Sequence, residues 1–167
     1  MRLSSCVAAG AFLAGLLGGV AAASAASLEA RVSIPDQTMT VTRNGRVVHT
    51  WKVSTARSGY KTPSGEWRPY RMHVMWRSIK YDNAPMPYAV FYDRGYAIHG
   101  TTAVSRLGSP ASHGCVRLLT ENAQTFYNLV KEVGPGNTRV IVSNEPQPPV
   151  ATANASSSII SLGEAAN

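Results

Sequence analysis

Polar and apolar residues alternate in two short runs of the chain, Thr38–Thr42 and Val47–Val53. A period of two is typical of strands, because successive side chains of a strand point to opposite faces. Asn44-Gly45, between the runs, is a preferred pair for a two-residue turn that needs positive φ angles. The pattern predicts a β-hairpin. One of its faces carries Val47, His49, Trp51 and Val53.

Further strand patterns follow along the chain. Thr62–Gly65 (TPSG) predicts a turn, and the aromatic and β-favouring residues of Trp67–Arg77 predict strands or an extended flap. Asn83–Pro87 contains two prolines in five residues, which favours a loop. The runs on either side of Asp93–Gly95 predict a second hairpin, which places His99 at the end of a strand.

Only one segment has a helical period. Its apolar positions are spaced i, i+3, i+4 and i+7, at Ala123, Phe126, Tyr127 and Val130. Thr120 is expected as the N-cap, and Gly134-Pro135 is expected to end the helix. A last strand is expected at Thr138–Val142. The predicted fold is mainly β with one principal α-helix.

The two ends of the chain differ in composition from the middle. Arg2, an apolar stretch at Val7–Val20 and the small residues Ala23-Ser24-Ala25 predict a signal peptide over residues 1–25. Four glycines interrupt the apolar stretch, which favours cleavage over a retained membrane anchor. Residues 145–167 are rich in Pro, Ala and Ser, which predicts a disordered tail. Residues 26–144 are expected to form one domain.

The 167-residue chain carries a net charge of +7 that is spread without a basic run. Such a charge favours anionic surfaces, for example cell-wall polymer or lipid headgroups, and solubility alone would also explain it. We find no nucleic-acid motif, and we expect a monomer without nucleic-acid partners.

Cysteine and histidine supply the candidate chemistry. Removal of the signal peptide would remove Cys6 and leave Cys115 unpaired in an exported protein, where cysteines are normally paired. Cys115 lies in Ser112–Arg117 (SHGCVR), which follows Ile98–Thr101 (IHGT). A thiol attacks as thiolate, and a nearby imidazole can assist its ionisation. A reactive cysteine is therefore the first interpretation, with a buried inert thiol as the alternative.

These two motifs, together with Thr62–Gly65, resemble the L,D-transpeptidase catalytic domain of the YkuD type. The resemblance covers roughly residues 30–144. It implies a sandwich-like fold with a helix beside the active site, a periplasmic or cell-envelope location and peptidoglycan stem peptides as substrate. It also implies that His99 is the general base and that the backbone carbonyl of Gly100 orients its ring.

Acyl transfer through a Cys115 thioester needs further groups around the sulfur. Backbone N–H groups of Gly114 and Cys115 are the expected oxyanion donors, because glycine lets a backbone approach substrate closely. His113 is expected to tune the thiolate. Arg117 falls on the same side as Cys115 in an extended segment and offers a bidentate partner to a stem carboxylate.

Weaker substrate-binding candidates are Arg106 and Ser112, whose plainer roles would be a solvated arginine and a turn-stabilising hydroxyl. The resemblance adds Tyr81, Met86 and Tyr88 as residues of a flap over the cleft; simple packing is the alternative. His49 and His73 are expected to be structural.

Several alternatives stay open at this point. The acyl acceptor could be an amine of another stem, giving a 3-3 cross-link, an amine of an envelope protein, a D-amino acid, or water in an L,D-carboxypeptidase. His99, His113 and Cys115 could instead hold zinc, although two ligands separated by one glycine would be unusual. The chain could also bind cell-wall peptide without turnover. We expect no cofactor and no metal.

Overall fold

The computed structural model describes residues 27–147 of the chain. The predicted signal peptide lies outside this range, as does the predicted tail beyond Gln147. Within residues 27–147, no helix is both long and apolar enough to cross a membrane.

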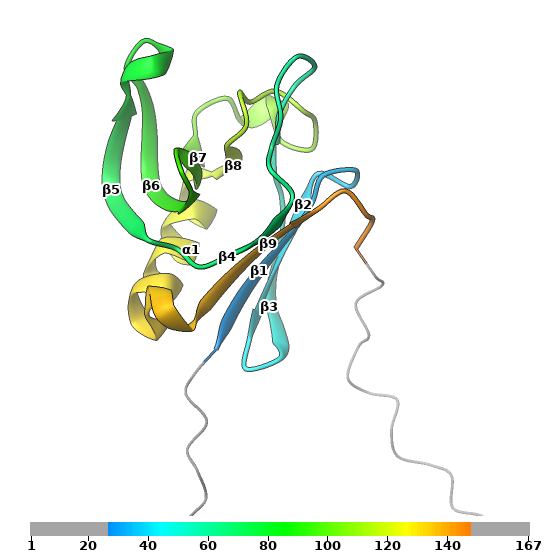
Figure 1. Cartoon of the computed structure of the whole chain (residues 1–167), viewed down its shortest axis with the longest axis vertical. Coiled ribbons are helices and arrows are strands. Elements are labelled where there is room, and N and C mark those ends of the chain that lie inside the picture. Colours follow the sequence, from blue (N-terminus) through cyan, green and yellow to red (C-terminus); the bar gives the residue numbers. More distant parts are fainter. Residues whose placement is uncertain (1–26, 148–167) are drawn as a thin grey trace, which may run out of the picture.

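Two β-sheets form most of the described chain (Figure 1). The first has the strand order β3-β2-β1-β9-β4, with β1 antiparallel to β2 and parallel to β9. The second has the order β5-β6-β7-β8, with β7 and β8 parallel. The strands of the first sheet are Leu28–Ser33 (β1), Thr38–Arg43 (β2), Arg46–Lys52 (β3), Gly65–Trp67 (β4) and Thr138–Ser143 (β9). Those of the second are Arg71–Ser78 (β5), Ala84–Asp93 (β6), Tyr96–Thr101 (β7) and Val116–Leu119 (β8).

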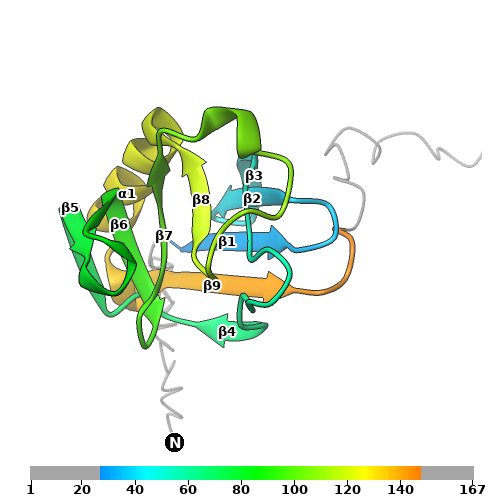
Figure 2. The ribbon, with the colours of Figure 1, turned by 90° about the horizontal axis from the view of Figure 1, so that it is seen from above.

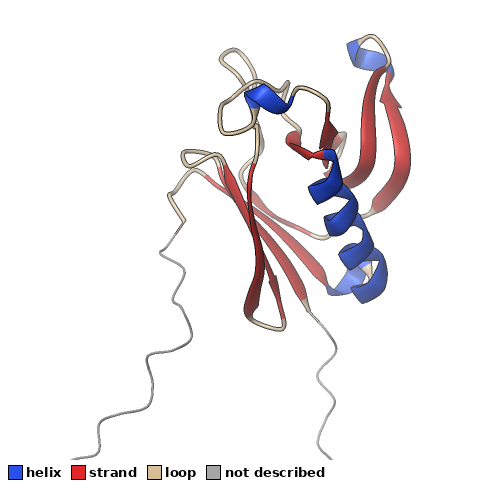
Figure 3. Cartoon of the chain, turned by 180° about the vertical axis from the view of Figure 1, so that it is seen from behind, coloured by secondary structure: helices blue, strands red, loops and turns tan. Residues whose placement is uncertain are grey.

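The two sheets and one helix enclose a common core. Figure 2 shows that β7 and β8 run crosswise to β1 and β9, and Figure 3 shows the helix α1 (Thr120–Val133) alongside the second sheet. Buried side chains of both sheets and of α1 belong to one apolar cluster, which includes Val32, Ile98 and Phe126. The predicted architecture, mainly β and sandwich-like with one principal helix, is confirmed.

The first predicted hairpin is present as β2 and β3. Its turn residues Asn44 and Gly45 have φ angles of 52° and 76°, as the sequence predicts. β3 is an edge strand, and the register of the hairpin shifts at Val41/Thr42. His49 and Trp51 stack on each other with ring centroids 4.6 Å apart, and Val47 stays exposed.

The loop predicted at Asn83–Pro87 is wrong, because β6 already begins at Ala84. Pro85 and Pro87 face Arg77 and Met75 of β5, while β6 pairs with β7 only from Val90 onward. One side of this part of β6 is therefore unpaired, and a strand tolerates proline where no ladder hydrogen bond is lost. The result is a long β5–β6 hairpin, closed by the 3₁₀ turn Ile79–Tyr81 (η1). We call this hairpin and turn, residues 71–93, the flap.

The helix spans Thr120–Val133 and buries Ala123, Phe126 and Val130 as the period predicts. Thr120 is its first residue rather than its N-cap, because β8 runs directly into the helix through Leu119. The Thr120 hydroxyl donates to the Thr101 carbonyl at 3.4 Å instead. Gly134, with φ 91°, ends the helix as expected.

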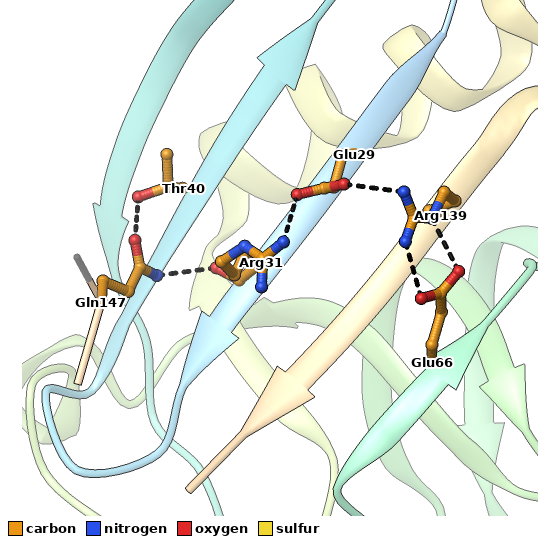
Figure 4. A network of polar contacts seen from close by, with 6 residues as sticks. All are labelled: Glu29, Arg31, Thr40, Glu66, Arg139 and Gln147. Atoms are coloured by element: carbon orange, nitrogen blue, oxygen red, sulfur yellow. Dashed lines mark hydrogen bonds and ion pairs between the residues drawn. The ribbon is translucent and has the colours of Figure 1, made fainter. Parts of the chain in front are cut away.

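An ion-pair chain crosses the outer face of the first sheet (Figure 4). Glu29 pairs with Arg31 at 2.9 Å and with Arg139 at 3.3 Å, and Arg139 pairs with Glu66 at 2.6 Å. The hydrogen bond from Arg139 lowers the pKa of Glu66. Exposed pairs of this kind contribute little to the free energy of unfolding.

The described residues beyond Asn144 lie against the turn between β1 and β2. The Gln147 backbone N–H donates to Asp36 at 2.7 Å, and its side-chain amide donates to the Arg31 carbonyl at 2.8 Å. The Ser33 hydroxyl donates to the Glu145 carbonyl at 3.0 Å. Glu145 and Gln147 of the predicted tail are thus held by hydrogen bonds.

Candidate active site

Parallel pairing of β7 with β8 brings the two sequence motifs together. His99 of β7 lies opposite Arg117 of β8, and Ile98 lies opposite Val116. Side chains of paired residues point to the same face, so His99 and Arg117 share one face while Ile98 and Val116 enter the core. Cys115 directly precedes β8 and lines the same cavity as His99 and Arg117.

This face of the second sheet carries a small apolar cluster and a cavity. Met86, Ala89, Phe91 and Ala97 are buried together, with Trp76 and Cys115 packed against them. A cavity of about 460 Å³ opens between the flap and the segment Ser112–Arg117. Seven predicted site residues line it: Tyr81, Met86, His99, Ser112, His113, Cys115 and Arg117.

The structure does not bring Tyr88 and Arg106 to this cavity. Tyr88 has a φ of 53° within β6 and has no partner in the β5–β6 register. This backbone turns its ring onto α1, where it meets Tyr127 with centroids 6.0 Å apart. Arg106 ends a 3₁₀ turn, Val104–Arg106, and lies outside the cavity lining. Neither residue lines the cavity, and the substrate contacts expected of them stay a prediction.

The His99 ring is buried and held in one tautomer. Its Nδ1 lies 2.7 Å from the Gly100 carbonyl oxygen. A carbonyl only accepts, so Nδ1 carries the proton and Nε2 keeps the lone pair that a base needs. Burial lowers the pKa of His99 to about 4; the Gly100 hydrogen bond opposes this change and the Arg117 charge adds to it. At neutral pH the ring is an uncharged base.

Burial has the opposite effect on the cysteine, because the charged form of a thiol is the deprotonated one. The pKa of Cys115 is raised by burial, and the backbone of Ala97 and the charge of Arg117 partly offset the rise. A lowered imidazole pKa beside a raised thiol pKa means that both groups are neutral at rest.

This charge state predicts the pH dependence of alkylation by iodoacetamide. The rate should rise about tenfold per pH unit up to pH 9, because the thiolate fraction grows until the pH passes the raised pKa of Cys115. The measurement is intact mass against time between pH 5 and pH 10. A rate plateau between pH 5 and pH 8 would show a preformed imidazolium–thiolate pair and contradict the assignment.

Ser112 shapes the loop that carries the nucleophile. Its hydroxyl donates to the Cys115 carbonyl at 2.6 Å and accepts from the Gly114 N–H at 2.9 Å. Its own N–H donates to the Thr55 carbonyl at 2.9 Å. Ser112 thus takes the loop-stabilising role. The Gly114 N–H, expected as an oxyanion donor, is already used inside the loop, which leaves the Cys115 N–H as the remaining candidate of the two.

Gly114 is required by the backbone. Its φ is 129°, and a Cβ there would lie 2.4 Å from Cε1 of Tyr96 and 2.8 Å from the Lys61 carbonyl oxygen. We expect Gly114→Ala to lower the free energy of unfolding by about 2–4 kcal/mol through strain and overpacking. Gly136→Ala is the matched control, since nothing lies within 4 Å of that Cβ. Chemical denaturation measures both; equal midpoints would contradict the prediction.

His113 contacts the flap and the loop before β4. Its ring stacks on Tyr81 with centroids 4.2 Å apart and meets the edge of Tyr60 at 4.5 Å. Desolvation, followed by the charges of Arg57, Arg117 and Lys80, lowers the pKa of His113. The cation that acts on the Cys115 thiol is Arg117. His113 therefore joins the flap to the nucleophile loop, and its expected effect on the thiolate stays a prediction.

Sequence analysis missed some residues of the cavity. Trp76 and Phe91 form its apolar wall next to Cys115, and Lys80 adds a second cation to the lining. The alternation of side chains along β6 could have identified Phe91. It places Phe91 on the opposite face of the strand from the core residues Val90 and Tyr92. Among residues 27–147, no three His, Cys, Asp or Glu side chains gather as a metal site, so the zinc alternative lacks its ligand geometry.

Comparisons with known proteins agree with this geometry. The family YkuD, described as L,D-transpeptidase catalytic domain, matches residues 29–142. A Bacillus subtilis (strain 168) protein named as an L,D-transpeptidase, YkuD, is 27% identical over 116 residues, which is 67% of this chain and 63% of that protein. An Escherichia coli (strain K12) protein named as an L,D-transpeptidase, YbiS, is 43% identical over 65 residues, 39% of this chain and 20% of that protein. This chain thus spans less than two thirds of either relative.

Solved structures show the same fold. L,D-transpeptidase 3 from Mycobacterium tuberculosis in complex with a faropenem-derived adduct superposes with a TM-score of 0.61 at 27% identity, over 71% of this chain and 60% of that one. An L,D-transpeptidase from M. tuberculosis H37Rv gives a TM-score of 0.60 at 28% identity, over 71% of this chain and 58% of that one. With the family match over residues 29–142, the chain belongs to the YkuD family of L,D-transpeptidase catalytic domains.

Proposed function

We propose that this chain is an exported cysteine L,D-transpeptidase that acts on peptidoglycan tetrapeptide stems through a thioester on Cys115. One observation carries the proposal: Cys115 lines the same cavity as His99, whose Nδ1 is fixed on the Gly100 carbonyl at 2.7 Å. The tautomer leaves Nε2 as a base, and burial keeps the ring uncharged at neutral pH. Membership of the family supports the same reaction class.

The first half of the reaction forms the thioester. Sγ of Cys115 bonds to the donor carbonyl carbon while the thiol proton passes to Nε2 of His99. The C–N bond then breaks, and the imidazolium returns the proton to the leaving amine. Because burial lowers the pKa of His99 below that of a free imidazole, its imidazolium is a better proton donor than a solvent-exposed one.

The second half regenerates the enzyme. An acceptor amine attacks the thioester carbon, and its proton passes to Nε2 of His99. The C–S bond breaks, and the proton returns to Sγ of Cys115. When water attacks instead of an amine, the product is a carboxylic acid, and the net reaction is that of an L,D-carboxypeptidase.

Charge supports an anionic substrate for this cavity. Arg117 is half-buried and lines the cavity with Cys115 and Lys80. A partly buried guanidinium binds a carboxylate through two parallel hydrogen bonds. We assign to Arg117 the carboxylate of the terminal residue that leaves, and in turn that of an incoming acceptor. Transfer to a second stem gives a 3-3 cross-link, transfer to a protein amine attaches an envelope protein, and transfer to a D-amino acid exchanges the last residue.

The proposed setting is the periplasm or cell envelope, reached through the signal peptide expected over residues 1–25. The net charge of +7 suits an anionic wall polymer. We propose that the protein acts there as a monomer.

Incubation with purified tetrapeptide muropeptides tests the function. Intact mass of the protein should show a thioester, and mass spectrometry of the products identifies the acceptor as a dimer, an exchanged D-residue or a tripeptide. Faropenem is a second acylating probe, because a neighbour in structure holds a faropenem-derived adduct. A protein that binds muropeptides yet gains no acyl mass with either probe would be a non-catalytic binding module.

A further inference from the structure

A second cavity, of about 370 Å³, adjoins the first and also has Cys115 in its lining. The two cavities are continuous, because they share most of the lining of the second: Trp76, Ser78, Lys80, Tyr81, Phe91, Gly95, His113 and Cys115. Arg71, Ile79 and Tyr96 line the second cavity alone, whereas His99 and Arg117 line the first alone. Cys115 therefore lies in the shared part of two adjoining cavities, each of which also has lining residues of its own.

The position of the base decides how a donor must lie across this junction. The leaving amine receives its proton from His99, so the leaving residue occupies the first cavity. The carbonyl carbon is bonded to Sγ of Cys115, and the rest of the acyl chain continues away from the leaving nitrogen. The second cavity is therefore the side on which the acyl chain of the donor peptide lies.

Arg71, the first residue of β5, stands in this second cavity on a surface of aromatic rings. Its guanidinium carbon lies 4.3 Å from the centroid of Phe91 and 4.7 Å from that of Trp76. Stacking on ring faces fixes the plane of a guanidinium and leaves its N–H edges open. Within residues 27–147, Arg71 has no ion-pair partner, and its backbone lies at the exposed start of β5.

The charge of the second cavity points to the chemistry of its ligand. Arg71 and Lys80 line it, and none of its described lining residues is Asp or Glu. Phe91 and Trp76, which hold Arg71, also form the wall beside Cys115. A guanidinium held open on the acyl side of the nucleophile is suited to a carboxylate group on that side of the donor.

We propose that Arg71 selects the donor by binding a carboxylate of its acyl chain, separate from the carboxylate of the leaving residue. This inference rests on the proposed transpeptidase function and adds a specificity residue to it. Stems whose acyl-chain carboxylates are amidated lack the anion, so Arg71 separates free stems from amidated stems. The selection acts on binding and not on the chemical step.

The test compares two synthetic tetrapeptide donors that share the terminal D-alanine. Their acyl-chain carboxylates are free in one donor and amidated in the other. We expect Arg71→Gln to raise KM for the free donor about tenfold, with kcat little changed and the amidated donor unaffected. Arg71→Lys should recover part of the loss, because it keeps the charge without the planar fork.

Arg77→Gln is the matched control, since Arg77 lies on the same strand outside both cavities. An equal rise in KM for the two donors, or the same rise in Arg77→Gln, would mean that Arg71 only packs against the flap. Either result would overturn this inference and leave the proposed function standing. Iodoacetamide alkylation of Cys115 at an unchanged rate shows that the cavity is intact. Failure of the wild-type protein to form a thioester with either donor would instead overturn the proposed function, and this inference with it.

Discussion

We expect Cys115→Ala to abolish the proposed thioester formation with muropeptides and to remove every acyl-transfer product. No other described residue of the cavity carries a thiol, and the base His99 cannot hold an acyl group in place of the sulfur. The fold should survive, because alanine fits the small apolar cluster of Ala89 and Ala97 on which Cys115 packs. Intact mass and product analysis measure the loss.

Cys115→Ser is a useful companion variant. It keeps the shape of the side chain and replaces the thiol by a hydroxyl, which is a far weaker nucleophile without an ionised form near neutral pH. Acyl mass on the serine variant at a greatly reduced rate would agree with the mechanism. Turnover by Cys115→Ala at a rate comparable to wild type would remove the covalent mechanism altogether.

His99→Ala should lower kcat/KM for acylation nearly as much as loss of the nucleophile, by about 10²–10⁴-fold. The neutral thiol of Cys115 needs a base during attack, because burial raises its pKa and keeps it protonated. The alanine variant also leaves the Gly100 carbonyl without its hydrogen-bond donor. His99→Gln can restore that hydrogen bond without restoring a base, so it separates the two effects. Pre-steady-state acylation by faropenem measures the rate.

His113→Ala is the comparison for this prediction. His113 stacks on Tyr81 and touches Tyr60, so its loss should loosen the flap and lower kcat/KM much less than His99→Ala does. If the two variants lose activity equally, the base has been assigned wrongly. Recovery of activity in His99→Gln to near the wild-type rate would show that His99 acts only through its hydrogen bond.

Turns and helices could be predicted from the sequence where a few neighbouring residues determine them. Asn44-Gly45 has the positive φ angles of its turn, and the period of Ala123 and Phe126 gives α1. Prolines misled the prediction at Asn83–Pro87, because the sequence does not show which side of a strand lacks a partner. β1 and β8 were missed, although their parallel partners β9 and β7 were predicted.

In the flap, the sequence also failed to predict where single side chains lie. The family resemblance suggested Tyr81, Met86 and Tyr88 together, yet Tyr88 turns onto α1 where its φ of 53° interrupts the ladder. Arg71 belongs to no sequence motif. Only the structure shows that it stacks on Phe91 and Trp76 in a cavity that Cys115 also lines. Such placements depend on strand register and not on residue type.

The sequence by itself determined the chemistry and the short-range structure of this protein: one thiol in a Ser-His-Gly-Cys motif, a histidine in an Ile-His-Gly motif, one amphipathic helix and a β-rich domain. Only the tertiary structure decided that His99 faces Arg117 across parallel strands, that Ser112 takes the Gly114 N–H, and that two adjoining cavities share Cys115. The reason is physical. Turns and helices are set by dihedral preferences over a few residues, whereas pairing and burial join distant segments and fix the charge state of each group by what surrounds it.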